Sequence, residues 1–305
     1  MTIAQTAKRV KKGDEIMNGM KKWTGPADCF QLRNGVAMPC VGFGTWQAPD
    51  GDVATNAVVS AIEAGYRHID TAEDYGNEAS VGAAIKKSGV PRDALFITSK
   101  LQNREHGYDK TMAAFERTMR QLDLDTLDLF LIHWPNPIFF RDNWQAANAG
   151  TWKAFEELYR AGRIRAIGIS NFQPRHIEAL METATIAPMV NQIRLCPGET
   201  QDEVVDYCNE HGILVEAYSP LGRGEVFKVP ELKRLAEKYQ KSIAQICVRW
   251  CLQRGYLPLP KSVTPSRIEE NIDIFDFELE AADVQLIADL EGFGGFWPNP
   301  DITTF

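Results

Sequence analysis

"RHIDTAEDYGNEASVGAAIKKS", residues 67–88, contains one strand followed directly by one helix. The β-rich run over 67–71 leads into a polar turn at Gly76-Asn77, and the pattern over 77–88 is helical. Asp70 lies near the end of the strand, and Tyr75 follows five residues later. Such a unit is the building block of an α/β fold.

The same alternation recurs along the chain. Short apolar runs predict strands at 41–45, 67–71, 95–100, 127–133, 166–170, 188–193, 214–219 and 257–262. Helical patterns follow at 52–64, 77–88, 109–122, 151–161, 173–183, 202–211, 229–239, 243–254 and 265–272. The strands are almost continuously apolar, which is typical of a parallel sheet covered on both faces. Eight such units favour an α/β fold of the (β/α)8 TIM barrel type over an open doubly wound sheet.

Further segments flank this repeat. "CFQLRNGVAMP" (29–39) predicts a hairpin that caps the barrel and turns at Asn34-Gly35. Two helical patterns precede the eighth strand, so one of them is an insertion, and another helix at 278–290 follows the barrel. Residues 1–28 are rich in lysine and poor in large apolar side chains, which indicates a flexible or loosely docked N-terminal extension rather than a partner-binding arm. We therefore expect a single domain over 29–305.

Composition and charge exclude several classes of protein. The 305 residues carry a formal net charge of −8, which argues against a nucleic-acid or anionic-membrane partner. No apolar run is long enough to span a bilayer, and the N-terminus lacks the apolar core of a secretory signal. The six cysteines fit a reducing cytoplasm, and no metal-binding motif is present. We expect a cytoplasmic monomer or weak homo-oligomer.

Polar residues recur at the carboxyl ends of the predicted strands, where TIM barrels build their active sites. These residues are Asp70, Lys100, His133, Ser170-Asn171, Gln192, Tyr218-Ser219 and Lys261-Ser262. One charged strand end is commonplace. Seven on the same rim predict a site.

Asp70, Tyr75 and Lys100 suggest proton transfer within that site. Taken alone, Lys100 could be a solvated strand cap and Tyr75 a surface turn residue. A partly buried Lys100 needs the counter-charge of Asp70, and close to the Tyr75 hydroxyl it would lower the phenol's pKa toward neutrality. Tyr75 could then donate a proton to a forming alkoxide. His133 is either a core histidine or a group that orients a carbonyl oxygen.

A carbonyl that gains a proton on oxygen needs a nucleophile at carbon, and the candidates are a cofactor hydride or a lysine. The G-x-G-x-x-G motif is absent, because "GFGTWQ" (42–47) and "GRGEVF" (222–227) both lack its last glycine. In "LPLPKSVTPSRIEEN" (257–271), Lys261, Ser262 and Arg267 bracket a turn that leads into a helix N-terminus. Such a turn favours an anion and suggests the extra phosphate of NADPH.

From about residue 29 onward, the chain resembles the aldo-keto reductases. The matching segments are "GYRHIDTAEDYGNEASVG" (65–82), "PKSVTPSRIEEN", "GFGTW", "LDLFLIHWP", "IGISNF", "MVNQI" and "AYSPLGRG", in the family's order. The tail "GGFWPNPDITTF" (294–305) is similar to that of the bacterial 2,5-diketogluconate and glyoxal reductase branch. The resemblance implies NADPH-dependent reduction of aldehydes and ketones, with small polar dicarbonyls or sugar-derived carbonyls as substrates.

The resemblance also implies a role for each matching residue. Tyr75 would be the general acid, Lys100 and Asp70 its tuning pair, and His133 the residue that orients the carbonyl. Asp70 and Thr45 would lie near the reacting end and the ribose of NADPH. The nicotinamide would contact Ser170, Asn171 and Gln192 through its amide and Tyr218 through its ring. The pyrophosphate would contact Ser219 and Leu221, the 2′-phosphate Lys261, Ser262 and Arg267, and the adenine Glu270 and Asn271. Trp46, Gln102, Trp134 and Trp297 would line the substrate pocket.

Two departures from the family pattern affect the substrate pocket. Gln102 stands where a tryptophan is common, which suggests a more polar carbonyl compound, and "RLCP" (194–197) replaces the usual segment after Gln192. The aromatic segment 134–150 is expected to be a long loop that covers the pocket or packs on the outer helices. Two other functions stay open: a Schiff-base aldolase through Lys100, which the charge of Asp70 disfavours, and a non-catalytic NADPH-binding regulatory subunit.

Overall fold

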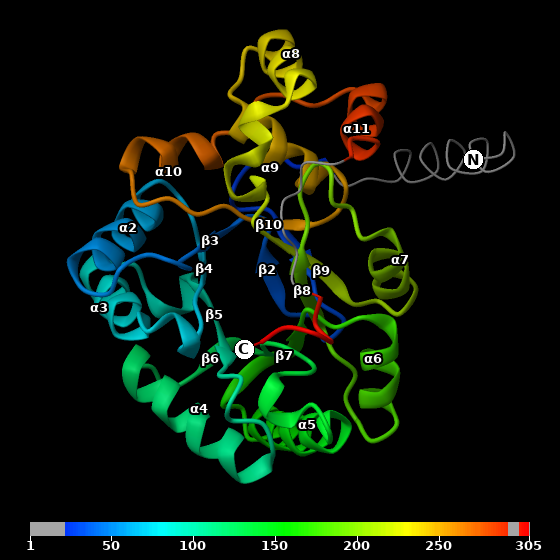
Figure 1. Ribbon diagram of the computed structural model, residues 1–305. Helices are drawn as coiled ribbons and strands as arrows, with labels where there is room; N and C mark the ends of the chain where they lie inside the picture. Colours follow the sequence, from blue (N-terminus) through cyan, green and yellow to red (C-terminus); the bar gives the residue numbers. More distant parts are fainter. Residues whose placement is uncertain (1–21, 292–298, 305) are drawn as a thin grey trace, which may run out of the picture.

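The computed structural model describes residues 22–291 and 299–304, and eight parallel strands form its centre (Figure 1). They neighbour one another in chain order, from β3 to β10. The Gly44 amide donates to the Pro260 carbonyl at 3.0 Å, which joins the two end strands. The predicted (β/α)8 barrel is thereby confirmed. The strands are β3 (Gly42–Gly44), β4 (His68–Asp70), β5 (Phe96–Leu101), β6 (Leu127–Ile132), β7 (Ile164–Ser170), β8 (Val190–Arg194), β9 (Leu214–Tyr218) and β10 (Leu257–Leu259).

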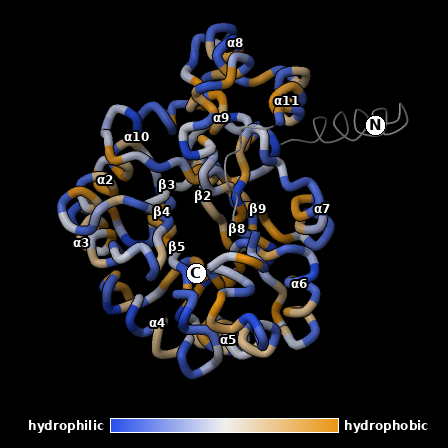
Figure 2. Tube along the Cα trace, viewed as in Figure 1, coloured by the Kyte–Doolittle hydropathy of each residue, from blue (hydrophilic) through white to orange (hydrophobic). Residues whose placement is uncertain are grey.

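Helices surround this sheet. In Figure 2, hydrophobic and hydrophilic residues alternate along them, because each helix buries one stripe against the strands. In α4, for example, Phe115, Met119 and Leu122 are buried. The helices are α2 (Asp52–Glu63), α3 (Glu78–Ser88), α4 (Tyr108–Leu122), α5 (Trp144–Arg160), α6 (Pro174–Met181), α7 (Asp202–Glu210), α8 (Pro230–Tyr239), α9 (Ile243–Gln253), α10 (Pro265–Ile272) and α11 (Ala281–Ala288).

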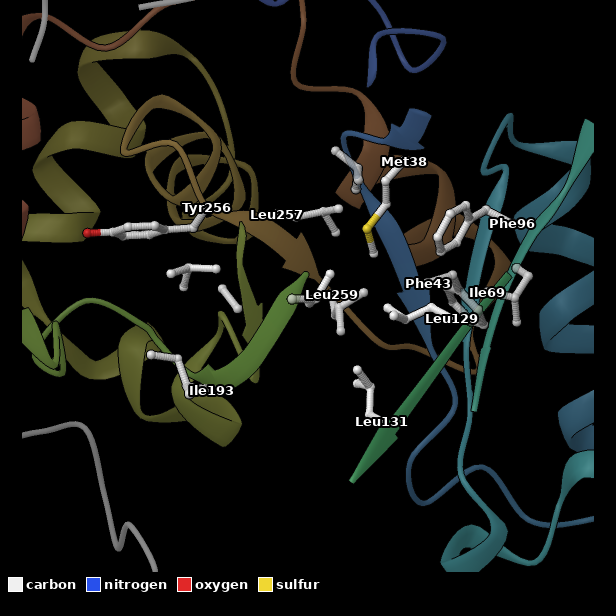
Figure 3. Packing of buried hydrophobic residues seen from close by; sticks show 14 of the residues in the cluster. Met38, Phe43, Ile69, Phe96, Leu129, Leu131, Ile193, Tyr256, Leu257 and Leu259 are labelled. Carbon is white, nitrogen blue, oxygen red and sulfur yellow. The ribbon is translucent and has the colours of Figure 1, made fainter. Parts of the chain in front are cut away.

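A hairpin of β1 (Cys29–Gln31) and β2 (Ala37–Pro39) closes the amino-terminal end of the barrel, as predicted. Met38 of β2 is fully buried and lies among apolar side chains of the barrel strands (Figure 3). Trp23, from the described end of the predicted extension, is also buried, with its ring centroid 4.5 Å from that of Phe30. Residues 22–28 therefore pack against the hairpin, and residues 1–21 lie outside the described part of the chain.

The structure corrects the predicted start of helix α5 and shows which of the helices α8 and α9 is the insertion. Helix α5 begins at Trp144, not at 151, so the loop predicted over 134–150 ends before Trp144. Gly150 is helical, and a Cβ there would approach the Tyr108 amide nitrogen to 3.1 Å, so this glycine permits close packing against the start of α4 rather than ending a helix. Of the two helices before β10, α9 packs on the barrel and α8 is the insertion at the periphery (Figure 1).

Candidate active site

A cleft of about 870 Å³ opens at the carboxyl ends of the strands. Its walls come from the segments that follow β3 to β10 and from the C-terminal tail, so residues far apart in sequence meet there. The residues that line it are Gly44, Trp46, Gln47, Asp70, Asp74, Tyr75, Asn103, Arg104, His133, Trp134, Phe139, Ser170, Asn171, Gln192, Tyr218, Ser219, Pro220, Leu221, Arg223, Leu259, Lys261 and Thr304.

Lys100 lies fully buried beneath the cleft and contacts both ionisable partners predicted for it. Its Nζ donates to the Asp70 carboxylate at 2.7 and 2.8 Å, to the Thr71 carbonyl at 2.9 Å and to the Tyr75 hydroxyl at 3.2 Å. Burial acts to lower the pKa of Lys100, but Asp70 and Tyr75 more than offset it, so this pKa is raised. The lysine is therefore a charged ammonium at neutral pH.

Tyr75 lies at the end of the short helix η1 (Glu73–Tyr75), where Gly76 turns the chain with a φ of 65°. Burial raises the pKa of Tyr75 to about 12, whereas Lys100 acts to lower it. The expectation that this pKa falls toward neutrality is wrong for the structure without cofactor or substrate. The reason is that the phenolate loses more hydration on burial than the neighbouring ammonium, itself paired with Asp70, can restore. Tyr75 thus keeps its proton at neutral pH.

His133 stands beside the phenol, with the two ring centroids 5.8 Å apart in an edge-on arrangement. Its Nδ1 lies 3.4 Å from a carboxylate oxygen of Asp74, and the backbone N–H of Asn103 donates to the same oxygen at 3.3 Å. Burial lowers the pKa of His133, and Asp74 acts in the opposite direction. The imidazole is consequently neutral at pH 7, and a carboxylate that the sequence analysis did not single out lies beside its Nδ1.

A chain of hydrogen bonds links the ends of β7, β8 and β9. The Tyr218 hydroxyl donates to the Asn171 side chain at 2.8 Å, and the Asn171 amide donates to the His133 carbonyl at 3.0 Å. Gln192 donates to Asp70 and to the buried Glu216, each at 2.8 Å. Asn171 and Ser219 both adopt left-handed backbone conformations, which are strained for non-glycine residues and here lie at the cleft.

The part of the cleft formed after β9 and β10 is cationic. Lys261 lines it and donates to the Gln47 carbonyl at 3.3 Å. The Arg223 guanidinium lies 4.7 Å from the centroid of the Trp46 ring. Among the described residues, neither cation has a carboxylate within ion-pair distance, so this side has the charge that a phosphate-bearing cofactor needs.

The cleft brings together most of the residues predicted from the sequence, but not all of them. Thr45 is buried beside it and bonds the Asp70 carbonyl at 3.0 Å. Gln102 is not among the lining residues: its backbone amide donates to Glu73 at 3.3 Å, and the neighbouring Asn103 and Arg104 line the cleft. The remaining predicted cofactor residues lie outside the lining: Ser262 precedes α10, and Arg267, Glu270 and Asn271 lie within it. Trp297 lies outside the described residues.

Several lining residues were not anticipated. Asp74 directly precedes Tyr75, and Arg104 lies four residues beyond Lys100, so their nearness to predicted site residues was an available signal. Phe139 belongs to the aromatic segment 134–150, in which only Trp134 was predicted to contact a ligand. Arg223 and Thr304 belong to a turn and to the C-terminal tail, and no local pattern directs them to the cleft.

Comparison with known proteins shows the class to which this fold and site belong. The model of the aldo/keto reductase family matches residues 40–291. The chain belongs to this family, which confirms the resemblance found in its motifs.

Individual relatives match over almost the whole chain. Glyoxal reductase of Bacillus subtilis (strain 168) is 48% identical over 282 residues, covering 92% of this chain and 99% of that protein. The crystal structure of a Bombyx mori aldo-keto reductase in complex with NADP has a TM-score of 0.78 and 37% identity, covering 87% of this chain and 92% of that one. The crystal structure of a Gox0644 mutant in complex with NADPH has a TM-score of 0.84 and 37% identity. The match covers 91% of this chain and 98% of that one.

Within the described residues, no helix combines the length and the apolar character needed to cross a membrane.

Proposed function

We propose that the protein reduces aldehydes and ketones to alcohols with NADPH. The observation that carries this proposal is the hydrogen-bonded set of Asp70, Lys100 and Tyr75 below an open cleft. It supplies a protonated phenol next to a permanent cation, which is what a carbonyl oxygen needs as negative charge develops on it.

Each side chain of the site has a separate role in this reaction. Tyr75 donates its proton to the carbonyl oxygen, and the Lys100 ammonium at 3.2 Å stabilises the phenolate left behind. Asp70 keeps that lysine charged. Neutral His133, held by Asp74, positions the carbonyl beside the phenol. NADPH, when bound, supplies the hydride to the carbonyl carbon.

The cofactor would lie along the β7–β10 side of the cleft. Ser170, Asn171 and Gln192 offer polar groups for the nicotinamide amide, and Tyr218 offers its ring. Ser219 and Leu221 line the path toward Lys261. Ser262 precedes α10, and Arg267, Glu270 and Asn271 lie within it, where the 2′-phosphate and the adenine would bind. The two cations Lys261 and Arg223 fit this assignment, since neither has a carboxylate partner among the described residues.

Small polar dicarbonyls and sugar-derived carbonyls are the proposed substrates, since the cleft combines the apolar walls of Trp46 and Trp134 with many polar groups. One relative is named glyoxal reductase, which agrees with this class. We infer a cytoplasmic monomer or weak homo-oligomer. The raised pKa of Lys100 disfavours the Schiff-base aldolase, which needs an uncharged amine.

The test is NADPH oxidation, followed by absorbance, with methylglyoxal, a nitrobenzaldehyde and 2,5-diketogluconate. Tyr75→Phe should lower kcat at least about 100-fold while NADPH still binds, because a proton donor is lost. Tyr207→Phe, which changes a tyrosine on α7 that stacks on His211, is the matched control and should retain activity. Tight NADPH binding without turnover of any carbonyl would instead indicate the regulatory subunit.

A further inference from the structure

Arg104 is the cation of the cleft that the proposed cofactor does not use. It lies in the turn after β5, and its guanidinium carbon lies 4.5 Å from the centroid of the Phe139 ring. In the part of the chain that the structure describes, no carboxylate lies within ion-pair distance of it. The stacking holds the planar guanidinium at the rim while leaving its N–H donors free for a ligand.

The sheet order separates Arg104 from the other cations. The strands run in the order β10-β9-β8-β7-β6-β5-β4-β3, so β5 lies opposite β9 and β6 opposite β10 (Figure 1). Arg104 and Phe139 follow β5 and β6, whereas Arg223 and Lys261 follow β9 and β10. A cofactor bound by Arg223 and Lys261 would therefore leave Arg104 facing the substrate end of the cleft.

Asp74 limits where a negative charge on the substrate can lie. Its carboxylate is 3.4 Å from His133, next to the groups that would contact the carbonyl. Burial acts to raise the pKa of Asp74, but His133 and the polar groups of Asn103 and Gln102 more than offset it, so this pKa is lowered. An anion directly beside the carbonyl would be repelled by this ionised carboxylate. An anion at the rim would meet Arg104 instead.

We propose that Arg104 binds an oxyanion, a carboxylate or a phosphate, at the end of the substrate distant from the carbonyl. The inference rests on the proposed carbonyl reduction and names the substrate class of the same site: carbonyl compounds with a terminal anionic group. A guanidinium donates two parallel hydrogen bonds to either oxyanion, which gives orientation as well as affinity.

The experiment compares charged and neutral substrates of matched shape: 4-carboxybenzaldehyde with benzaldehyde, and glyceraldehyde 3-phosphate with glyceraldehyde. The variants are Arg104→Met and, as matched control, Lys110→Met. Lys110 donates to the backbone carbonyl of Arg104 at 3.4 Å and lies 5.5 Å from the Phe140 ring centroid, but does not line the cleft, so it controls for disturbance of the turn itself. The readout is the ratio of kcat/KM for the charged over the neutral partner.

We expect Arg104→Met to lower this ratio about fivefold, mainly through KM, for the benzaldehyde pair, the glyceraldehyde pair or both, and Lys110→Met to leave it unchanged. The pair that responds identifies the oxyanion as carboxylate or phosphate. An equal ratio in wild type and Arg104→Met for both pairs would overturn the proposal while leaving carbonyl reduction intact. Absence of turnover with all four substrates would instead count against the proposed function.

Discussion

Asp74 and Tyr75 are adjacent in sequence, yet they would serve two different partners. Tyr75 hydrogen-bonds Lys100 below the cleft, and Asp74 faces Nδ1 of His133. A neutral imidazole carries one N–H, and a carboxylate beside Nδ1 favours the tautomer with the proton there. Under the proposed mechanism, Asp74 would therefore be a positioning residue that acts on the carbonyl through His133.

Asp74→Asn should lower the pKa of His133, because the carboxylate that stabilises the imidazolium is lost while burial still opposes protonation. The change is measured by following the His133 ring through a pH titration by NMR. We also expect kcat to fall about tenfold as the ring loses its anchor. Asp142→Asn, an exposed carboxylate in the segment before α5, should leave both quantities as in the wild type.

Helices α3 and α4 approach each other closely at Gly82. A Cβ at this position would overlap the backbone carbonyl oxygen of Leu122, at the end of α4, and a backbone atom cannot rotate away. The position of α4 matters to the site because α4 follows the turn that carries Arg104. A glycine inside a helix thus sets the spacing between neighbouring helices.

Gly82→Ala should destabilise the protein by about 2 kcal/mol, since the two helices must separate to admit a methyl group. Denaturant unfolding at equilibrium measures the loss. Gly25→Ala is the comparison: no atom lies within 4 Å of its Cβ position, so its free energy of unfolding should stay close to that of the wild type. Equal effects of the two substitutions would contradict the packing argument.

The barrel interior as a whole changes from apolar at the hairpin end to polar beneath the cleft. Met38 and its neighbours fill the closed end (Figure 3). His68 and Glu216 are fully buried nearer the cleft, with 3.6 Å between Nε2 and a carboxylate oxygen. Burial lowers the pKa of His68 to about 3 and raises that of Glu216 to about 8. Both groups are therefore uncharged at neutral pH.

Glu216 should make the folded protein less stable as pH rises. Its pKa is higher in the folded than in the unfolded chain, so the folded state binds the extra proton, and this stabilisation is lost as pH rises toward and through 8. Between pH 6 and 8, wild type should lose up to about 1.4 kcal/mol per pH unit relative to Glu216→Gln, measured by denaturant unfolding. Glu182→Gln, which changes an exposed carboxylate, should follow the wild type.

Local patterns in the sequence were enough to predict the alternation of strands and helices, the capping hairpin, and the polar residues at the strand ends. These features depend on residues close together in the chain, and the closed barrel follows from repeating one unit eight times. Other features required the folded structure. The start of α5 at Trp144 is one of them. The approach of Asp74 to His133 and the contact of Arg104 with Phe139 each bring together segments that follow different strands. The raised pKa of Tyr75 has the same origin, because burial depends on the residues that surround a side chain in space, and those come from the whole barrel.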